Sequence, residues 1–171
     1  MEYQAQIREI PEHTIYFKEY FVSNMAEFFQ GLAKQNFLQD LSDRVLLENP
    51  AIRLTDPEYN VILYPDGEYK ETDVRIEFCD AVTGAGEDTS EYGFRTVPRM
   101  TVLSVAHRGP YHRLSEAYDF AVRWMKENGY RKAGCPRSSA VDGFWNKKEE
   151  ADYLTEMQIP VEKKSAETPA W

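Results

Sequence analysis

The sequence is poor in cysteine and histidine, with two and three of them among 171 residues. Cys79 and Cys135 lie far apart and share no metal-type spacing with the histidines, so we predict neither a metal site nor another cofactor. We interpret both cysteines as reduced thiols of a cytoplasmic protein. No apolar run approaches the length of a bilayer span, and the N-terminal residues alternate like a strand instead of forming a signal core. A membrane partner is therefore not expected.

Basic residues are also scarce, since 20 Lys and Arg face 29 Asp and Glu and leave a formal charge of −9. Such a field repels phosphate backbones, so direct nucleic-acid binding is not expected. It mildly favours cationic small molecules. Aromatic residues are plentiful at 13%, which is enough to build a core and to line a pocket as well.

Two stretches of the chain resemble each other in the same order in each half. IREIPEHTIYF (7–17) matches FRTVPRMTVLS (94–104) at a shift of 87, and ETDVRIEFCDAV (71–82) matches EADYLTEMQIPV (150–161) at a shift of 79. The first match pairs Arg8 with Arg95, and the second pairs Glu77 with Glu156. Two matches in one order predict an internal duplication.

Each half has the pattern of a strand, a helix and two further strands. A bent strand with a central proline covers 3–20 or 93–108. The first helix begins with Asn24 and Glu27 at capping-box spacing, and the second is bounded by Gly109-Pro110 and Gly129. Two strands then close each half, near 60–65 and 72–82 and near 133–145 and 151–161. We predict an α+β fold of one domain over 1–161, made of halves 1–83 and 93–161, with a linker at 84–92 and a loose tail at 162–171.

In this fold the helices cover one side of antiparallel sheets, and the uncovered side forms a groove across the two halves. Strand alternation in DYLTEMQIPV (152–161) puts Met157 in the core and Leu154 and Glu156 on the groove side. Glu77 takes the matching place in the first half. Two simpler interpretations of Glu156 stay open: a solvated edge residue, or the partner of Arg75 or Arg137.

The segments HRGPY (107–111), ENGY (127–130) and TEMQIPV (155–161) resemble the GyrI-like small-molecule-binding domain, also called the bacterial effector-binding domain. The similarity covers 94–161 well and 3–82 more loosely. It implies a tandem repeat of the strand-helix-strand-strand unit and a ring-lined groove with a carboxylate at its base, here Glu156. Regulators of this family carry a helix-turn-helix, whereas residues 1–20 here read as the first strand, so we expect a stand-alone member.

The resemblance implies three candidate functions. The first is the binding of amphipathic or cationic aromatic compounds by a carboxylate-floored aromatic groove. The second is hydrolysis of cyclopropanoid DNA-alkylating compounds, with Glu156 as the catalytic base that activates water. The third is interaction with a protein partner, of the gyrase-inhibitor type.

Binding and hydrolysis would use the same side chains. We expect burial to raise the pKa of Glu156 and a cationic ligand to offset that cost. Of the adjacent Phe144 and Trp145, we favour Trp145 as the ring that points inward. The Tyr rings have core or rim packing as their alternative role, and the C-terminal Trp171 belongs to the tail. The expected ligand-binding residues are Glu156, Glu77, Tyr16, Tyr20, Tyr64, Trp145 and Leu154.

Overall fold

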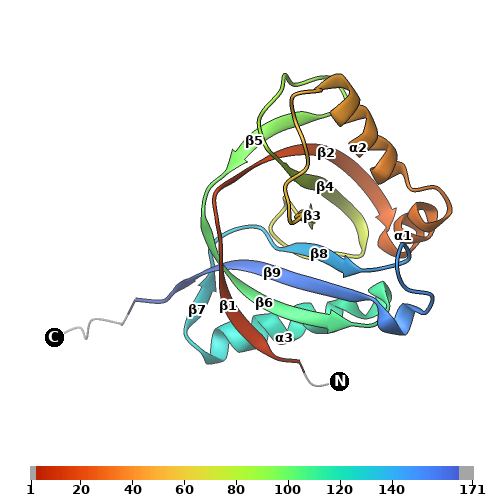
Figure 1. Ribbon diagram of the computed structural model, residues 1–171. Helices are drawn as coiled ribbons and strands as arrows, with labels where there is room; N and C mark the ends of the chain where they lie inside the picture. Colours follow the sequence, from red (N-terminus) through yellow and green to blue (C-terminus); the bar gives the residue numbers. More distant parts are fainter. Residues whose placement is uncertain (1–2, 166–171) are drawn as a thin grey trace.

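A computed structural model describes residues 3–165 and has a mixed α+β fold (Figure 1). Trp171, which the sequence analysis assigns to the tail, lies outside the described residues. Three α-helices and two short 3-10 helices connect the strands: α1 (Met25–Lys34), α2 (Phe37–Glu48), η1 (Tyr111–Arg113), α3 (Leu114–Glu127) and η2 (Glu150–Asp152). The strands are β1 (Ala5–Ile10), β2 (His13–Asn24), β3 (Asn60–Leu63), β4 (Thr72–Val82), β5 (Gly93–Val97), β6 (Met100–Arg108), β7 (Tyr130–Lys132), β8 (Arg137–Asp142) and β9 (Leu154–Lys163).

The strands form one curved antiparallel sheet in the order β1-β6-β9-β8-β3-β4-β2-β5, and β7 pairs with β9 at its end. The two halves meet at the centre of the sheet, where Ile62 of β3 faces Ser138 of β8. Residues 83–92 connect β4 to β5 without helix or strand. β9 continues to Lys163, two residues into the expected tail.

The first strand of each half joins the sheet of the other half. β1 pairs with β6, and β5 pairs with β2, so the chain crosses over at Pro11 and Pro98. Arg8 faces Val102 in the first of these pairs, and Arg95 faces Ile15 in the second. These positions correspond at the shift of 87, so the pairing agrees with the predicted repeat. The duplication itself remains a prediction.

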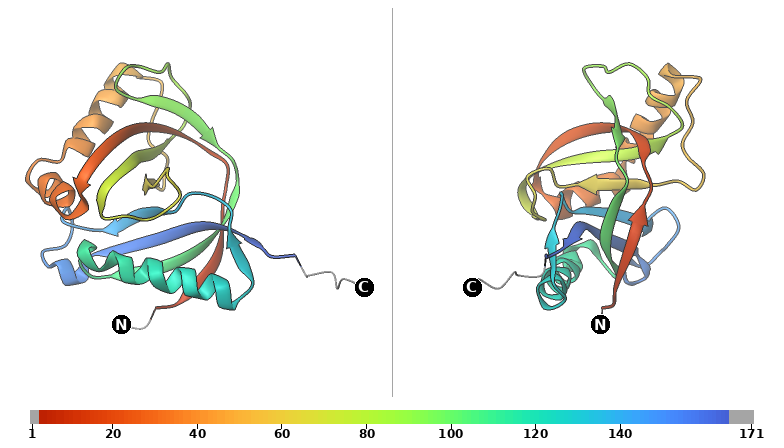
Figure 2. Two further views of the ribbon diagram at one scale, coloured as in Figure 1. Left: turned by 180° about the vertical axis from the view of Figure 1, so that it is seen from behind. Right: turned by 90° about the vertical axis from the view of Figure 1, so that its left-hand side faces the viewer.

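Helices cover one face of this sheet, as expected. Below α1 and α2, β2 and β4 contribute Tyr16, Ile76 and Phe78 to a first core. Below α3, β6 and β9 contribute Leu103 and Met157 to a second core. Figure 2 shows α3 lying across β6 and β9, and α1 with α2 beside the strands of the first half. The other side of the sheet, which we call the helix-free face, carries the alternate residues of each strand.

The helix boundaries follow from local chemistry. Asn24 caps α1 by accepting a 3.2 Å hydrogen bond from the amide of Glu27, as the capping-box spacing predicted. Gly129 follows α3 with φ of +74°, a conformation that glycine adopts without steric cost. The prediction of a single helix in the first half is wrong, because α2 adds a second one. Asn36 caps α2 in the same way as Asn24 caps α1.

Candidate functional site

Strand register places both predicted carboxylates on the helix-free face. Glu77 lies opposite Leu63 of β3, and Glu156 lies opposite Ser139 of β8. Directly opposed residues of antiparallel strands point to the same face, and Leu63 packs in a small cluster separate from the two helix-covered cores. The expected placement of Glu77 and Glu156 on one common face is therefore what the structure has.

Glu156 is already neutralised by the protein. Its Oε2 atom forms an ion pair with Arg8 and accepts a hydrogen bond from Ser104, and its Oε1 atom accepts a 2.8 Å bond from the amide of Gln158. The carboxylate side chain is only 16% exposed. Burial by itself would raise the pKa of Glu156, but the bonds from Ser104, Arg8 and Gln158 outweigh it and lower the pKa. The expected rise of this pKa is therefore wrong.

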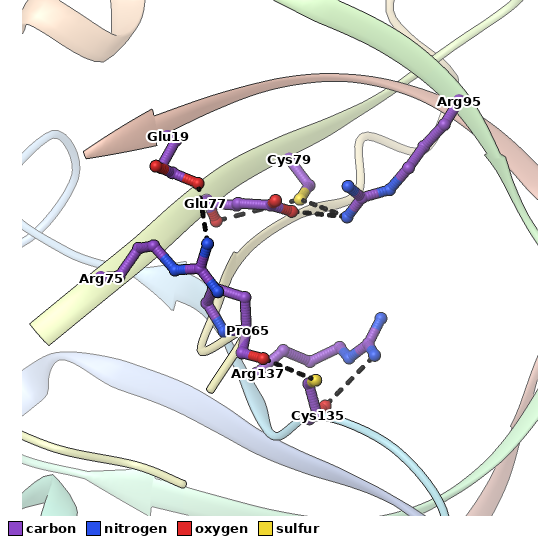
Figure 3. Close-up of polar contacts among 8 residues, drawn as sticks. All are labelled: Glu19, Pro65, Arg75, Glu77, Cys79, Arg95, Cys135 and Arg137. Atoms are coloured by element: carbon purple, nitrogen blue, oxygen red, sulfur yellow. Dashed lines mark hydrogen bonds and ion pairs between the residues drawn. The ribbon is translucent and has the colours of Figure 1, made fainter. Parts of the chain in front are cut away.

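Glu77 forms the corresponding pair in the other half. Arg95 donates a 2.6 Å hydrogen bond to its carboxylate (Figure 3). The Arg95 guanidinium also lies 4.4 Å from the centre of the Phe17 ring. Arg8 and Arg95 are matched by the repeat, and so are Glu156 and Glu77. Each arginine thus crosses with its exchanged strand to the carboxylate of the other half. Arg75, one of the two partners considered for Glu156, instead pairs with Glu19 and Asp66.

Side chains fill most of the groove expected between these two pairs. Tyr59 lines this region and donates a 2.5 Å hydrogen bond to the side-chain amide oxygen of Gln158, whose amide nitrogen in turn donates to Glu156. What remains open near Tyr59 is a hollow of about 10 Å³, room for a single water molecule. In this conformation the hollow beside Tyr59 has no space for an aromatic ligand.

The three tyrosines predicted to line the groove lie on the other side of the sheet. Tyr16 is fully buried in the first core, where its hydroxyl donates a 3.0 Å bond to Asp80. Tyr64 is equally buried, and its ring packs edge-on against Tyr69 at 5.1 Å. Tyr20 packs against Phe28 and Phe37, also in the first core. Their placement differs from the expected one because β2 and the segment from β3 to Tyr64 present their even-numbered residues to the first core.

The remaining predicted residues are also separated from Glu156 or peripheral to it. Trp145 lies in the loop after β8, is 50% exposed, and packs edge-on against Phe144 at 5.4 Å. Phe144 is the ring that points inward, against the first core. The preference for Trp145 over Phe144 is therefore wrong. Leu154 begins β9, half-buried and opposite Arg108, on the same strand face as Glu156.

A larger hollow opens where α1 of the first half meets η1 of the second. Its volume is about 140 Å³. Phe29 of α1 stacks on Tyr111 of η1 with 4.0 Å between ring centres and 15° between ring planes, and Tyr111 lies 5.5 Å from Tyr153. We call it the junction hollow, and it is lined by Ala26, Phe29, Gln30, Ala33, Pro110, Tyr111, His112, Phe144, Glu150 and Tyr153.

Glu150 supplies the negative charge of the junction hollow. Glu150 is exposed, and among residues 3–165 it takes part in no ion pair. Burial raises the pKa of Tyr111 to about 12, with further contributions from Tyr153 and from the charge of Glu150. Burial and the charge of Glu150 also raise the pKa of Tyr153. The tyrosines are neutral at physiological pH, so the hollow combines uncharged rings with one free carboxylate.

Sequence reasoning missed this hollow although one signal for it was present. Tyr111 belongs to HRGPY, one of the segments that carried the family resemblance, and the expected bounds of the second helix, Gly109-Pro110 and Gly129, placed it inside that helix. Instead it lies on a 3-10 turn before α3 and faces Phe29 of the other half. Contacts between halves leave no periodic trace in a sequence. Within the described residues, no three His, Cys, Asp or Glu side chains are grouped to hold a metal, and no helix has the length and apolar character of a membrane span.

Comparison with known proteins identifies the fold clearly. The family model of the GyrI-like small molecule binding domain matches residues 7–162. The crystal structure of the EcmrR C-terminal domain is similar at 38% sequence identity and a TM-score of 0.85, over 95% of this chain and 99% of that chain. In a cryo-EM structure of an EcmrR–DNA complex the identity is again 38% and the TM-score is 0.84, but the match covers 94% of this chain and 58% of EcmrR. This chain thus spans little more than half the length of the EcmrR chain in that complex.

A crystal structure of a hydrolase from Listeria innocua is similar at a TM-score of 0.63, over 93% of this chain and 92% of that chain. Its sequence identity is 11%, so the likeness shows a shared fold and nothing about shared chemistry. A search of curated proteins finds no match.

Proposed function

Because the chain belongs to the GyrI-like small molecule binding domain family, we propose that it binds a small amphipathic molecule in the junction hollow, with a cationic group held among the rings and Glu150. The observation that carries this proposal is the convergence of Phe29 and Tyr111, from different halves, on one open hollow with an unpaired carboxylate at its edge. Small-molecule sites are typically concave, mostly apolar, and equipped with a few polar groups.

The size of the hollow suits a single ring or a trimethylammonium group. An apolar cavity of roughly 150 Å³ takes up benzene, and the junction hollow has about 140 Å³. A cation over an aromatic face gains about 0.5–2 kcal/mol per contact, and more rings add further contacts. Glu150 adds long-range attraction without a competing arginine. The net charge of −9 favours the approach of a cation in the same way.

Glu156 is the weaker candidate for a cation site. A cationic ligand there has to displace Arg8 and open a face that Tyr59 and Gln158 fill. Hydrolysis through Glu156 requires a water on its carboxylate, whose two oxygens accept three hydrogen bonds from protein side chains. The hydrolytic function therefore rests on the family resemblance alone. Interaction with a transcription regulator or with another protein partner likewise rests on the similarity to EcmrR and its family.

The proposal is tested by calorimetric titration with benzyltrimethylammonium and, as a charge control, phenylmethanesulfonate. We expect the cation to bind more tightly than the anion. Glu150→Gln should weaken cation binding about 5- to 20-fold, and Tyr111→Leu by a similar factor, because each removes one attractive contact of about 1–2 kcal/mol. Glu149→Gln is the matched control, since it makes the same charge change one residue outside the hollow.

Two outcomes would overturn the proposal. If Glu149→Gln weakens binding as much as Glu150→Gln, the effect is general electrostatics and the junction hollow is not the site. If Glu156→Gln abolishes binding while Glu150→Gln does not, the ligand lies on the helix-free face as the sequence first indicated. Equal affinity for the two probes would remove the cationic preference.

A further inference from the structure

The small hollow on the helix-free face has a different chemistry from the junction hollow. It has about 10 Å³ and lies among apolar strand residues, Tyr59, His13, Arg95 and Arg137. Val61 and Ile15 form its apolar walls and belong to the small core cluster of this face. A space of this size holds one water-sized particle. Its polar lining is dominated by nitrogen donors.

Arg137 is the least satisfied of these donors. Its Nε atom is buried and has no hydrogen-bond partner, and its guanidinium makes a single 3.2 Å bond to the carbonyl oxygen of Cys135. Among residues 3–165 it takes part in no ion pair, unlike Arg8 and Arg95. Desolvation lowers the pKa of Arg137, which expresses the cost of a buried cation without a counter-charge. Arginine nonetheless stays protonated at any physiological pH.

Arg95 adds a second positive charge at the same hollow. In Figure 3 the guanidinium group of Arg95 ends beside Glu77 and Cys79, and the guanidinium group of Arg137 ends below it, beside Cys135. Glu77 neutralises Arg95 from the side. The charge of Arg95 reaches Arg137 and disfavours its protonated form. The positive charge of Arg137 therefore remains uncompensated beside a hollow that has room for one water-sized particle.

We propose that this hollow is a binding site for a monoatomic anion, a halide, with Arg137 as its main ligand and Arg95 as its second. A halide is the anion nearest in size to a single water molecule, whereas carboxylates, sulfate and phosphate are too large for 10 Å³. The Nε–H of Arg137 supplies the hydrogen bond, and the bound charge compensates the guanidinium. This inference does not depend on the junction hollow, because none of its residues lines that site.

The first test is direct. Crystals of the wild-type protein are soaked in sodium bromide, and anomalous diffraction is recorded at the bromine edge. We expect a peak in the hollow within hydrogen-bond distance of Arg137 Nε. An uncharged water at this position, with bromide found only at the surface, would overturn the proposal.

The second test uses thermal unfolding in sodium chloride against sodium methanesulfonate at equal ionic strength. Wild type should gain stability with chloride, and Arg137→Gln should weaken the apparent chloride affinity about 10-fold or more, because a charge-assisted bond is lost. Arg131→Gln, an exposed arginine paired with Glu162, is the matched control and should respond like wild type.

The variant also reports on its own folding. In chloride-free buffer Arg137→Gln should be at least as stable as wild type, because an uncompensated buried charge is gone. A variant that is much less stable there, and whose stability still rises with chloride as in wild type, would show that Arg137 has a packing role and does not hold an anion.

Discussion

The junction hollow and the helix-free face each have rings and a carboxylate of the second half, only six residues apart in the chain. Glu150 stands at the edge of the junction hollow without a counter-ion among the described residues, next to Tyr111 and Tyr153. Glu156 lies on the helix-free face beneath Arg8, with three hydrogen bonds to its oxygens. The first carboxylate is available to a ligand and the second is committed to the fold.

The difference arises from the exchange of strands between the halves. β1 carries Arg8 into the sheet of the second half, and β5 carries Arg95 into the sheet of the first. Each exchanged arginine forms an ion pair with a carboxylate of the other half: Arg8 with Glu156, and Arg95 with Glu77. A carboxylate on a sheet face is therefore a binding group only if no distant strand supplies its partner. Glu150 lies on η2, outside the sheet, where neither exchanged strand reaches.

The largest expected effect comes from a third carboxylate, Asp80, which is 5% exposed and has no arginine partner among residues 3–165. Burial raises the pKa of Asp80 to about 7, and the bond from Tyr16 offsets this only in part. The folded state thus binds this proton more tightly than the unfolded state, so stability falls as the pH rises from about 4 to about 7. A shift from 3.8 to about 7 corresponds to at most about 4 kcal/mol.

Asp80→Asn removes this titration while keeping the shape of the side chain. We expect the variant to equal wild type near pH 4 and to be more stable by about 2–4 kcal/mol at pH 8, measured by urea unfolding across that range. Asp119→Asn, an exposed residue of α3, serves as the control and should show no such trend. A constant difference between Asp80→Asn and wild type at every pH would refute the assignment.

The second effect concerns the Arg8–Glu156 pair itself. Arg8→Gln leaves a largely buried carboxylate without its cation, so the pKa of Glu156 should rise and stability at pH 7 should fall by about 1–3 kcal/mol. The stabilisation from Glu156 is present above its ordinary pKa and is lost as the pH falls through the lowered folded value. Adding Glu156→Gln should cost less than the two single changes together.

Arg99→Gln provides the comparison for Arg8→Gln, because Arg99 pairs with Glu9 at the surface with 70% of its side chain exposed. That change should cost about 0–1 kcal/mol. Equal losses for Arg8→Gln and Arg99→Gln would mean that Glu156 is not held by Arg8 in solution.

The sequence predicted the fold well because the fold depends on local patterns. The caps at Asn24 and Gly129, the alternation in β4 and β9, and the prolines at 11 and 98 all act within a few residues. α2 was missed although Asn36 caps it and Leu41 and Val45 form its buried stripe. The same strand-helix-strand-strand pattern was read in both halves, and it leaves room for only one helix in the first half.

The candidate site was predicted less well because it depends on contacts between distant segments. Alternation placed Glu156 on the correct face but gave no indication that Arg8, 148 residues away, lies on its carboxylate. The stack of Phe29 on Tyr111 joins the two halves through residues that the sequence places only within the first and the second helix. Faces of strands follow from a period of two, whereas partners across a fold follow from topology.

The smallest expected effect separates the two rings of the loop after β8. Trp145 is 50% exposed and rests on Gly143, while Phe144 packs into the first core and lines the junction hollow. Trp145→Ser should therefore change stability by no more than about 0.5 kcal/mol and leave cation binding as in wild type. Phe144→Leu keeps an apolar side chain of similar volume but removes a ring, so it should weaken benzyltrimethylammonium binding about 2- to 5-fold. Calorimetry on both variants decides the point, and a loss of binding in Trp145→Ser with none in Phe144→Leu would move the ligand from the junction hollow to the outer side of this loop.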